Sequence, residues 1–151
     1  MRRIVHGWVF DNRGRILMQR IAATRERHPL RWGSSVAGHC LDREPSARAI
    51  VRKACAELGL DYLDGVEWRE RLRHTTAEDG TVRVLYHALW NGSRDELQLD
   101  RAQIEQIAWC HTIAVRAALR VVPEQFTPAF RGLWVAWERQ GATIAILPNA
   151  P

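Results

Sequence analysis

Lysine is almost absent from this sequence. Of its 22 lysine and arginine residues only Lys53 is a lysine, and 17 aspartates and glutamates leave a net charge of +5. A basic chain can attract nucleic acid or another anionic partner. The usual sign of such a surface, a lysine-rich tail or a clustered basic run, is missing. We therefore interpret the charge as an arginine-rich composition and expect no nucleic-acid partner.

Paired cysteines and long apolar runs are also lacking. Cys40, Cys55 and Cys110 form no CxxC pair, which argues against a zinc ribbon and favours free thiols in a reducing cytoplasm. No window of about 18 apolar residues would form a transmembrane helix. The N-terminus shows neither the long apolar run nor the small-residue cleavage site of a signal peptide. We expect a cytoplasmic protein with no membrane partner.

What is present predicts one layered domain. A chain of 151 residues, 46% hydrophobic, is long enough to bury a real core, so we expect a single domain over residues 1–151. Residues 4–10 and 16–20 have strand character and predict a hairpin around a turn at 11–15. Residues 21–35 are polar and contain chain breakers, which predicts a long loop.

A helix follows over residues 46–58. Pro45 suits its first turn and Gly59 its C-terminal cap. An apolar stripe is expected to face the core. Its members are Ala47, Ile50, Val51, Ala54 and Leu58.

The second half repeats the alternation of strands and helices. A second hairpin should turn at Asp79-Gly80, followed by a short strand at 107–110 and a helix capped by Thr112. Thr127 and Pro128 begin a last helix with one apolar face, formed by Phe130, Leu133, Trp134 and Trp137. The tail, residues 141–151, is expected to be loose. The order predicts a mixed α/β (α+β) fold with the sheet and helices in layers.

The stretch from Gly38 to Leu60 carries the most specific signal. Glu44 follows Gly38 after five residues, Arg52 follows after seven more, and Glu57 and Gly59 complete the spacing. This pattern resembles the Nudix box, G-x5-E-x7-R-E-U-x-E-E-x-G-U, where U is apolar. Flanking stretches resemble the branch that contains isopentenyl-diphosphate isomerase and related hydrolases. They are WVFDNRGRILMQR, WGSSVAGH, IEQIAWC and EQFTPAFRGLWVAW.

The resemblance covers about residues 4–140 and has definite implications. It implies a Nudix-like α/β/α sandwich with a mixed sheet and a small-molecule diphosphate as substrate. It also implies Mg²⁺ or Mn²⁺ as cofactor, and a homodimer is a further expectation because relatives often pair. In such a box, carboxylates at i, i+3 and i+4 converge on the metal, which activates water for attack at phosphorus.

Most of these carboxylates are missing here. The three positions hold Lys53, Ala56 and Glu57, and Gln103 stands where relatives often place a further acid. An ammonium at Lys53 would repel a divalent cation a few ångströms away. Residues that the isomerase needs at its active site are missing as well. Ala37 replaces its cysteine, and no acid lies at residues 83–85, although His39 matches one of its metal ligands.

The candidate site residues therefore have two interpretations each. Glu57 is either the remaining metal ligand and catalytic carboxylate or the partner of Lys53 in an ion pair. Lys53 either binds phosphate in place of the metal or is an ordinary surface residue. Glu44 and Arg52 are the orienting pair of the box, in a catalytic or a purely structural role. Gly38 and His39 would bind substrate, although a lone histidine is more often a loop residue.

A second cationic surface is predicted on the strand after residue 66. Arg69, Arg71 and Arg73 alternate, so they should share one face and could bind a diphosphate, with a solvated sheet face as the alternative. Two functions follow from the sequence. The first is a hydrolase of a diphosphate-linked metabolite with a depleted metal site and weak activity. The second is a non-catalytic module that binds a diphosphate or nucleotide.

Overall fold

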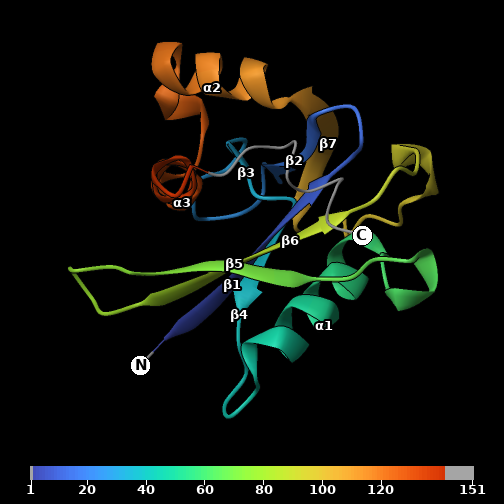
Figure 1. Ribbon diagram of the computed structural model, residues 1–151, viewed down its shortest axis with the longest axis horizontal. Helices are drawn as coiled ribbons and strands as arrows, with labels where there is room; N and C mark the ends of the chain where they lie inside the picture. Colours follow the sequence, from blue (N-terminus) through green and yellow to red (C-terminus); the bar gives the residue numbers. More distant parts are fainter. Residues whose placement is uncertain (1, 142–151) are drawn as a thin grey trace.

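The computed structural model describes residues 2–141, and within them seven strands form one mixed sheet (Figure 1). The central strand β1 pairs in parallel with β6, and the other pairings are antiparallel. The strands are β1 (Arg3–Phe10), β2 (Arg15–Ile21), β3 (Trp32–Gly33), β4 (Val36–His39), β5 (Arg69–Thr75), β6 (Val82–Leu89) and β7 (Ile104–His111). The helices are α1 (Ser46–Leu58), α2 (Thr112–Val121) and α3 (Pro128–Arg139).

Helices cover both faces of the sheet, which gives the expected three layers. In Figure 1, α1 lies on one side and α2 and α3 lie on the other. Alternate residues of β1 divide between the two cores, since Val5 and Val9 pack with α1 whereas Trp8 and Phe10 pack with α3. This alternation follows from the two-residue period of a strand. It yields the predicted α+β sandwich.

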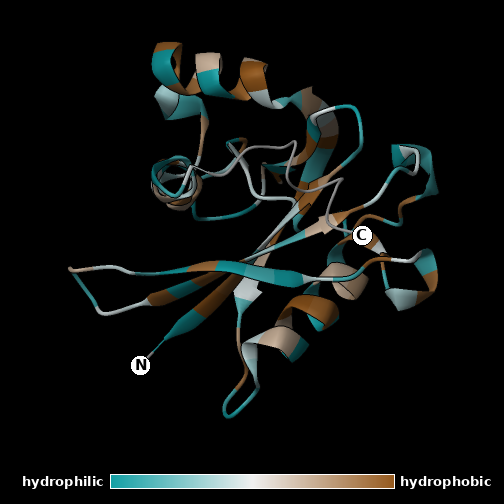
Figure 2. Cartoon of the chain, viewed as in Figure 1, coloured by the Kyte–Doolittle hydropathy of each residue, from teal (hydrophilic) through white to brown (hydrophobic). Residues whose placement is uncertain are grey.

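The helix of the box matches its prediction. Helix α1 runs from Ser46 to Leu58, and Gly59 caps it with a φ of 70° in the left-handed region, which glycine adopts without strain. Two members of the predicted apolar stripe are not buried, because Ala47 is exposed and Val51 keeps 42% of its surface. Helices α1 and α2 in Figure 2 alternate hydrophobic and hydrophilic bands, as one-sided burial requires.

The first hairpin is less regular than predicted. Strands β1 and β2 pair only at Phe10 and Ile16, after which β2 turns away to pair with β7. The loop predicted over residues 21–35 contains β3, and the stretch after it forms β4, which pairs with β1. These short strands gain their stability from neighbours far along the chain, which a local pattern does not reveal.

The second half confirms most of its elements. Strands β5 and β6 form the predicted hairpin, with Gly80 at a φ of 70° in the turn. Thr127 accepts a hydrogen bond from the Phe130 amide and Pro128 begins α3, as expected. Helix α2 differs, because His111 rather than Thr112 occupies the N-cap. Residues 142–151 of the predicted loose tail lie outside the described residues.

Candidate functional site

Glu44 and Arg52 form a two-bond ion pair that holds the loop of the box onto α1. Arg52 donates from Nε to Glu44 Oε2 at 2.8 Å and from Nη2 to Oε1 at 3.0 Å. The same Nη2 donates to the His39 carbonyl at 3.1 Å, and the Leu41 amide donates to Glu44. The Arg52 hydrogen bond is the main cause that lowers the pKa of Glu44 to about 2. The orienting pair of the box is therefore intact.

Arg3 is a further support that the sequence did not indicate. Its guanidinium donates to the Glu44 carbonyl at 2.6 Å and to Ser46 Oγ at 3.2 Å. Helix α1 has Pro45 at its N-cap and no side-chain cap bond, and Arg3 of β1 ties this end of the helix to the sheet by donating to the residues on either side of Pro45. Only the pairing of β1 with β4 brings Arg3 here.

Glu57 lies buried at the centre of the candidate site. It is 3% exposed, and its two carboxylate oxygens face different donors. Lys53 Nζ lies 3.0 Å from Oε2, and Gln19 Nε2 donates to Oε1 at 3.1 Å. Burial raises the pKa of Glu57, while the Lys53 ammonium opposes that rise. Glu57 thus forms the ion pair that one of its two interpretations predicted, with its carboxylate buried and Lys53 partly exposed.

Gly38 leaves the space in which the Lys53 side chain lies. A Cβ at this position would stand 2.2 Å from Lys53 Cε and 2.8 Å from Cδ, far inside van der Waals contact. Strand β4 therefore passes directly against the lysine stem and directs its ammonium to Glu57.

These residues do not fit a divalent metal ion as they are arranged. Magnesium requires several oxygen ligands, whereas both oxygens of Glu57 already accept bonds from Lys53 and Gln19. Over residues 2–141, no three His, Cys, Asp or Glu side chains gather as a metal site would require.

One arginine and two histidines form a row across the opposite face of the sheet. Ile4 pairs with both His39 and Arg83, and Arg83 pairs with His74, so these residues share one face. Arg83 Nη1 donates to Thr76 Oγ1, and its buried Nε has no partner within the described part of the chain. Burial is the first cause that lowers the pKa of Arg83. This guanidinium stands where the isomerases were expected to carry an acid.

The predicted shared face of Arg69, Arg71 and Arg73 is wrong. A bulge between Glu70 and Leu72 interrupts the alternation of β5. Arg69 pairs with His87, which in turn pairs with Trp8 of the α3 face, whereas Arg73 pairs with Val84 of the α1 face. Arg73 also forms two hydrogen bonds with Glu70.

The bulge also determines which arginines of β5 lie on the same side of the sheet as Lys53. Arg69 and Arg71 both lower the pKa of His87, after burial, to about 4. Arg69, through its pairing with His87, lies on the α3 side of the sheet, away from Lys53 on α1, and Arg71 is the residue at the bulge. The structure does not bring these two predicted substrate contacts together with Lys53 and Gly38.

The ion pair of Glu44 predicts a defined acid sensitivity. Its folded pKa is about 2 against an ordinary 4.5, so the stability it contributes is present above the ordinary value and is lost as pH falls toward 2. Glu44→Gln should lower the melting temperature at neutral pH, and its deficit against wild type should shrink on acidification. Thermal melts followed by circular dichroism measure both. Glu67→Gln, at a highly exposed carboxylate, is the control, and a deficit constant with pH would contradict the assignment.

Comparison with known proteins identifies the family. The NUDIX domain model matches residues 1–130. An isopentenyl-diphosphate Δ-isomerase of Nocardia farcinica is 30% identical over 123 residues, which are 80% of this chain and 69% of that protein. A MutT protein of Methanosarcina mazei superposes with a TM-score of 0.69 at 12% identity, covering 93% of this chain and 95% of the other.

A third structure is related in fold. The NUDIX domain of Shewanella oneidensis NrtR, complexed with ADP ribose, superposes with a TM-score of 0.60 at 14% identity, over 81% of this chain and 84% of that one. The match of the family model over most of the chain shows that this protein belongs to the NUDIX domain family. In the described part of the chain, no helix has the length and apolarity needed to span a bilayer.

Proposed function

We propose that the site at α1 binds the diphosphate group of a small molecule without a metal ion, and that it hydrolyses that group weakly or not at all. The observation that carries this proposal is the Lys53 ammonium, held 3.0 Å from the buried Glu57 carboxylate. Lysine has taken the place and the charge of the metal in a box whose frame is otherwise preserved.

The arrangement of Lys53 and Glu57 supports the binding of an anion on the solvent side of the lysine. Glu57 is only 4% exposed at its side chain, whereas Lys53 keeps 21%. The carboxylate thus lies beneath the ammonium, and the surface presents the cation. An ammonium has three N–H donors, and one bond to Glu57 leaves donors for phosphate oxygens. The Arg52 bonds hold the backbone of His39, and with it the adjoining loop, against α1, whereas the exposed His39 side chain lies on the other face of the sheet and does not join Lys53.

The known relatives support a diphosphate as the shared chemical group. The Nocardia relative is named for isopentenyl diphosphate, and the Shewanella NUDIX domain was crystallised with ADP ribose, whose two halves a diphosphate joins. Isomerisation itself is not proposed for this chain. It has Ala37 in place of the cysteine and no acid at residues 83–85, so it lacks the groups for proton transfer at carbon.

Thermal shift measurements with chelator present test the binding. We expect ADP and isopentenyl diphosphate to raise the melting temperature of wild type in EDTA, and the matching monophosphates to raise it less. In the double variant Lys53→Met/Glu57→Gln, which removes both charges together, the shift should disappear. Arg48→Met, at an exposed arginine of the same helix, should retain it.

Hydrolysis is the competing function, and the intact Glu44–Arg52 pair is the observation in its favour. Release of monophosphate from either ligand in Mg²⁺ or Mn²⁺, above the blank and lost in Glu57→Gln, would replace the proposal by conventional catalysis. A ligand shift that requires the metal would do so as well.

A further inference from the structure

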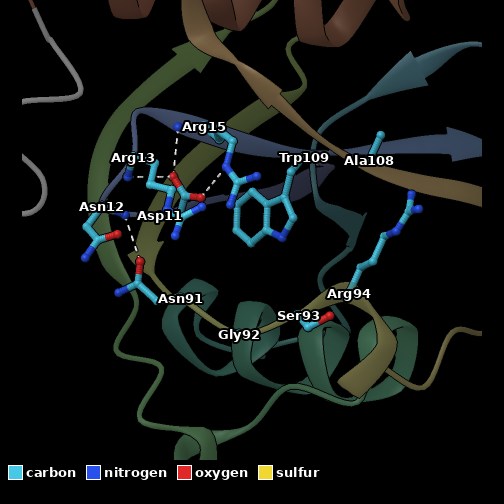
Figure 3. A pocket seen from close by; sticks show the side chains of 10 residues that line it. All are labelled: Asp11, Asn12, Arg13, Arg15, Asn91, Gly92, Ser93, Arg94, Ala108 and Trp109. Atoms are coloured by element: carbon cyan, nitrogen blue, oxygen red, sulfur yellow. Dashed lines mark hydrogen bonds and ion pairs between the residues drawn. The ribbon is translucent and has the colours of Figure 1, made fainter.

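A separate cavity lies beyond the C-terminal end of β1, at the turn into β2. Its volume is about 750 Å³, within the size range of small-molecule sites. Three segments distant in sequence line it: the turn between β1 and β2, the loop after β6, and β7 (Figure 3). Its lining includes Asp11, Arg13, Arg15, Arg94 and Trp109. None of them belongs to the box.

The charge of this cavity is strongly positive. Its lining contains three arginines and one carboxylate. Asp11 is 2% exposed and already accepts bonds from the Arg13 and Arg15 amides and, at 2.6 Å, from Arg15 Nε. Asp11 and Arg15 therefore neutralise one another, as the dashed lines in Figure 3 show. Arg13 and Arg94 remain without a carboxylate partner in the part of the chain that the structure describes.

Trp109 forms one wall of the cavity, and its indole N–H can donate a hydrogen bond but cannot accept one. One ring face stacks on Trp90, with centroids 6.1 Å apart at 22°, and the Arg15 guanidinium lies 5.4 Å from the ring centroid. Its buried Nε1 has no hydrogen-bond partner among residues 2–141. A buried N–H without an acceptor costs free energy. A ligand oxygen would satisfy it, and Figure 3 shows the ring lying between Arg15 and Arg94.

A neighbouring hollow has a different balance of charged residues, which helps to identify the class of ligand that the first cavity binds. It has a volume of about 420 Å³ and shares Arg94, but its lining contains two carboxylates, Asp95 and Glu105, beside two arginines, Arg94 and Arg101. The first cavity, with three arginines and one carboxylate, therefore has the larger excess of positive charge. An extended polyanion such as nucleic acid would need a longer cationic track than this one, so a small anion fits better.

We propose that this cavity is a second anion site, which binds a phosphate or polyphosphate group of a small molecule through Arg13, Arg94 and the Trp109 indole N–H. Guanidinium groups match the oxygens of phosphate with charge-assisted bonds. Because Trp90 and Arg15 occupy the ring of Trp109, the site recognises the phosphate group rather than a stacked base. This assignment is independent of the function proposed at α1.

Indole signals in ¹H–¹⁵N spectra of the full chain test the site. The seven tryptophans give separate side-chain signals, and Trp109→Phe identifies the one from Trp109. Titration with orthophosphate, diphosphate and tripolyphosphate should move this signal in a saturable way. The double variant Arg13→Gln/Arg94→Gln should weaken the affinity at least about ten-fold. Arg120→Gln, an exposed arginine on α2, should leave it unchanged.

Two comparisons distinguish phosphate binding in this cavity from binding at α1 and from a bulk salt effect. The Lys53→Met/Glu57→Gln variant should keep the Trp109 response, which separates this site from the one on α1. An equal response to sodium chloride at matched ionic strength would overturn the proposal, as would an unchanged affinity in Arg13→Gln/Arg94→Gln. Tighter binding of a single-stranded oligonucleotide than of tripolyphosphate, at equal phosphate concentration, would overturn the small-molecule assignment.

Discussion

Replacing Lys53 with methionine is expected to lower the free energy of unfolding at neutral pH by about 3 kcal/mol. The variant leaves the Glu57 carboxylate, which is 3% exposed, without its cation and with Gln19 as its remaining side-chain donor. Removing one partner of a buried ion pair costs much more than breaking a pair on the surface. Urea unfolding of the variant and wild type measures the difference.

The same variant should depend on pH in a characteristic direction. Burial already raises the pKa of Glu57 above its ordinary 4.5, and loss of Lys53 removes the group that opposes this rise. A carboxyl with a raised folded pKa binds more protons when folded, so stability is lost as pH rises through that pKa. The deficit should therefore be largest in neutral and basic solution and should shrink toward the ordinary pKa.

A compensating variant separates charge from packing. Lys53→Met/Glu57→Gln removes the stranded carboxylate and should recover most of the lost stability, whereas Arg48→Met on the same helix should change little. If Lys53→Met is as stable as wild type in neutral solution, Glu57 has another partner. The buried ion pair would then not be the central feature of this site.

Replacing Trp137 with alanine is expected to cost about 4 kcal/mol, the usual range for a buried tryptophan. Its side chain is 2% exposed, and its ring centroid lies 5.5 Å from that of Trp8, 5.9 Å from Phe10 and 5.0 Å from Trp134. The cavity left behind would open the core between α3 and the sheet. Guanidinium unfolding gives the free energy, and near-ultraviolet circular dichroism reports the loss of aromatic packing.

Val135 provides the matched control on the same helix. It is 49% exposed, so Val135→Ala should change the free energy of unfolding by less than about 0.5 kcal/mol. A similar small effect from Trp137→Ala would mean that α3 is not needed to cover this face of the sheet. The aromatic cluster on Trp8 would then not be the second core of the fold.

Elements governed by local interactions were predicted best from the sequence. Helix α1 begins and ends where Pro45 and Gly59 indicated, because capping and helical periodicity depend on residues within a few positions. The aromatic face of α3 was predicted for the same reason. The box was recognised from its spacing, and its missing carboxylates already suggested that Lys53 could replace the charge of a metal.

Contacts between segments that are distant along the chain could not be predicted from local sequence patterns. The stripe of α1 was assigned too broadly, since Ala47 and Val51 are exposed. The predicted alternation of side chains on β5 is interrupted at Arg71. The pairing of β5 with β6 shows a bulge there, which turns Arg69 and Arg73 to different faces of the sheet. The cavity beside Trp109 gave no signal, because its three segments are far apart along the chain.

The sequence by itself indicated the three helices, the longer strands, the resemblance to the Nudix box and the replacement of acids by Lys53 and Ala56. Only the tertiary structure decided that Glu57 is buried and that the Lys53 side chain packs against Gly38 on its way to this carboxylate. It also decided that Gln19 donates a hydrogen bond to the second carboxylate oxygen. The physical reason is that burial sets the strength of a charge interaction, and burial arises from strands and helices that meet only in the folded chain.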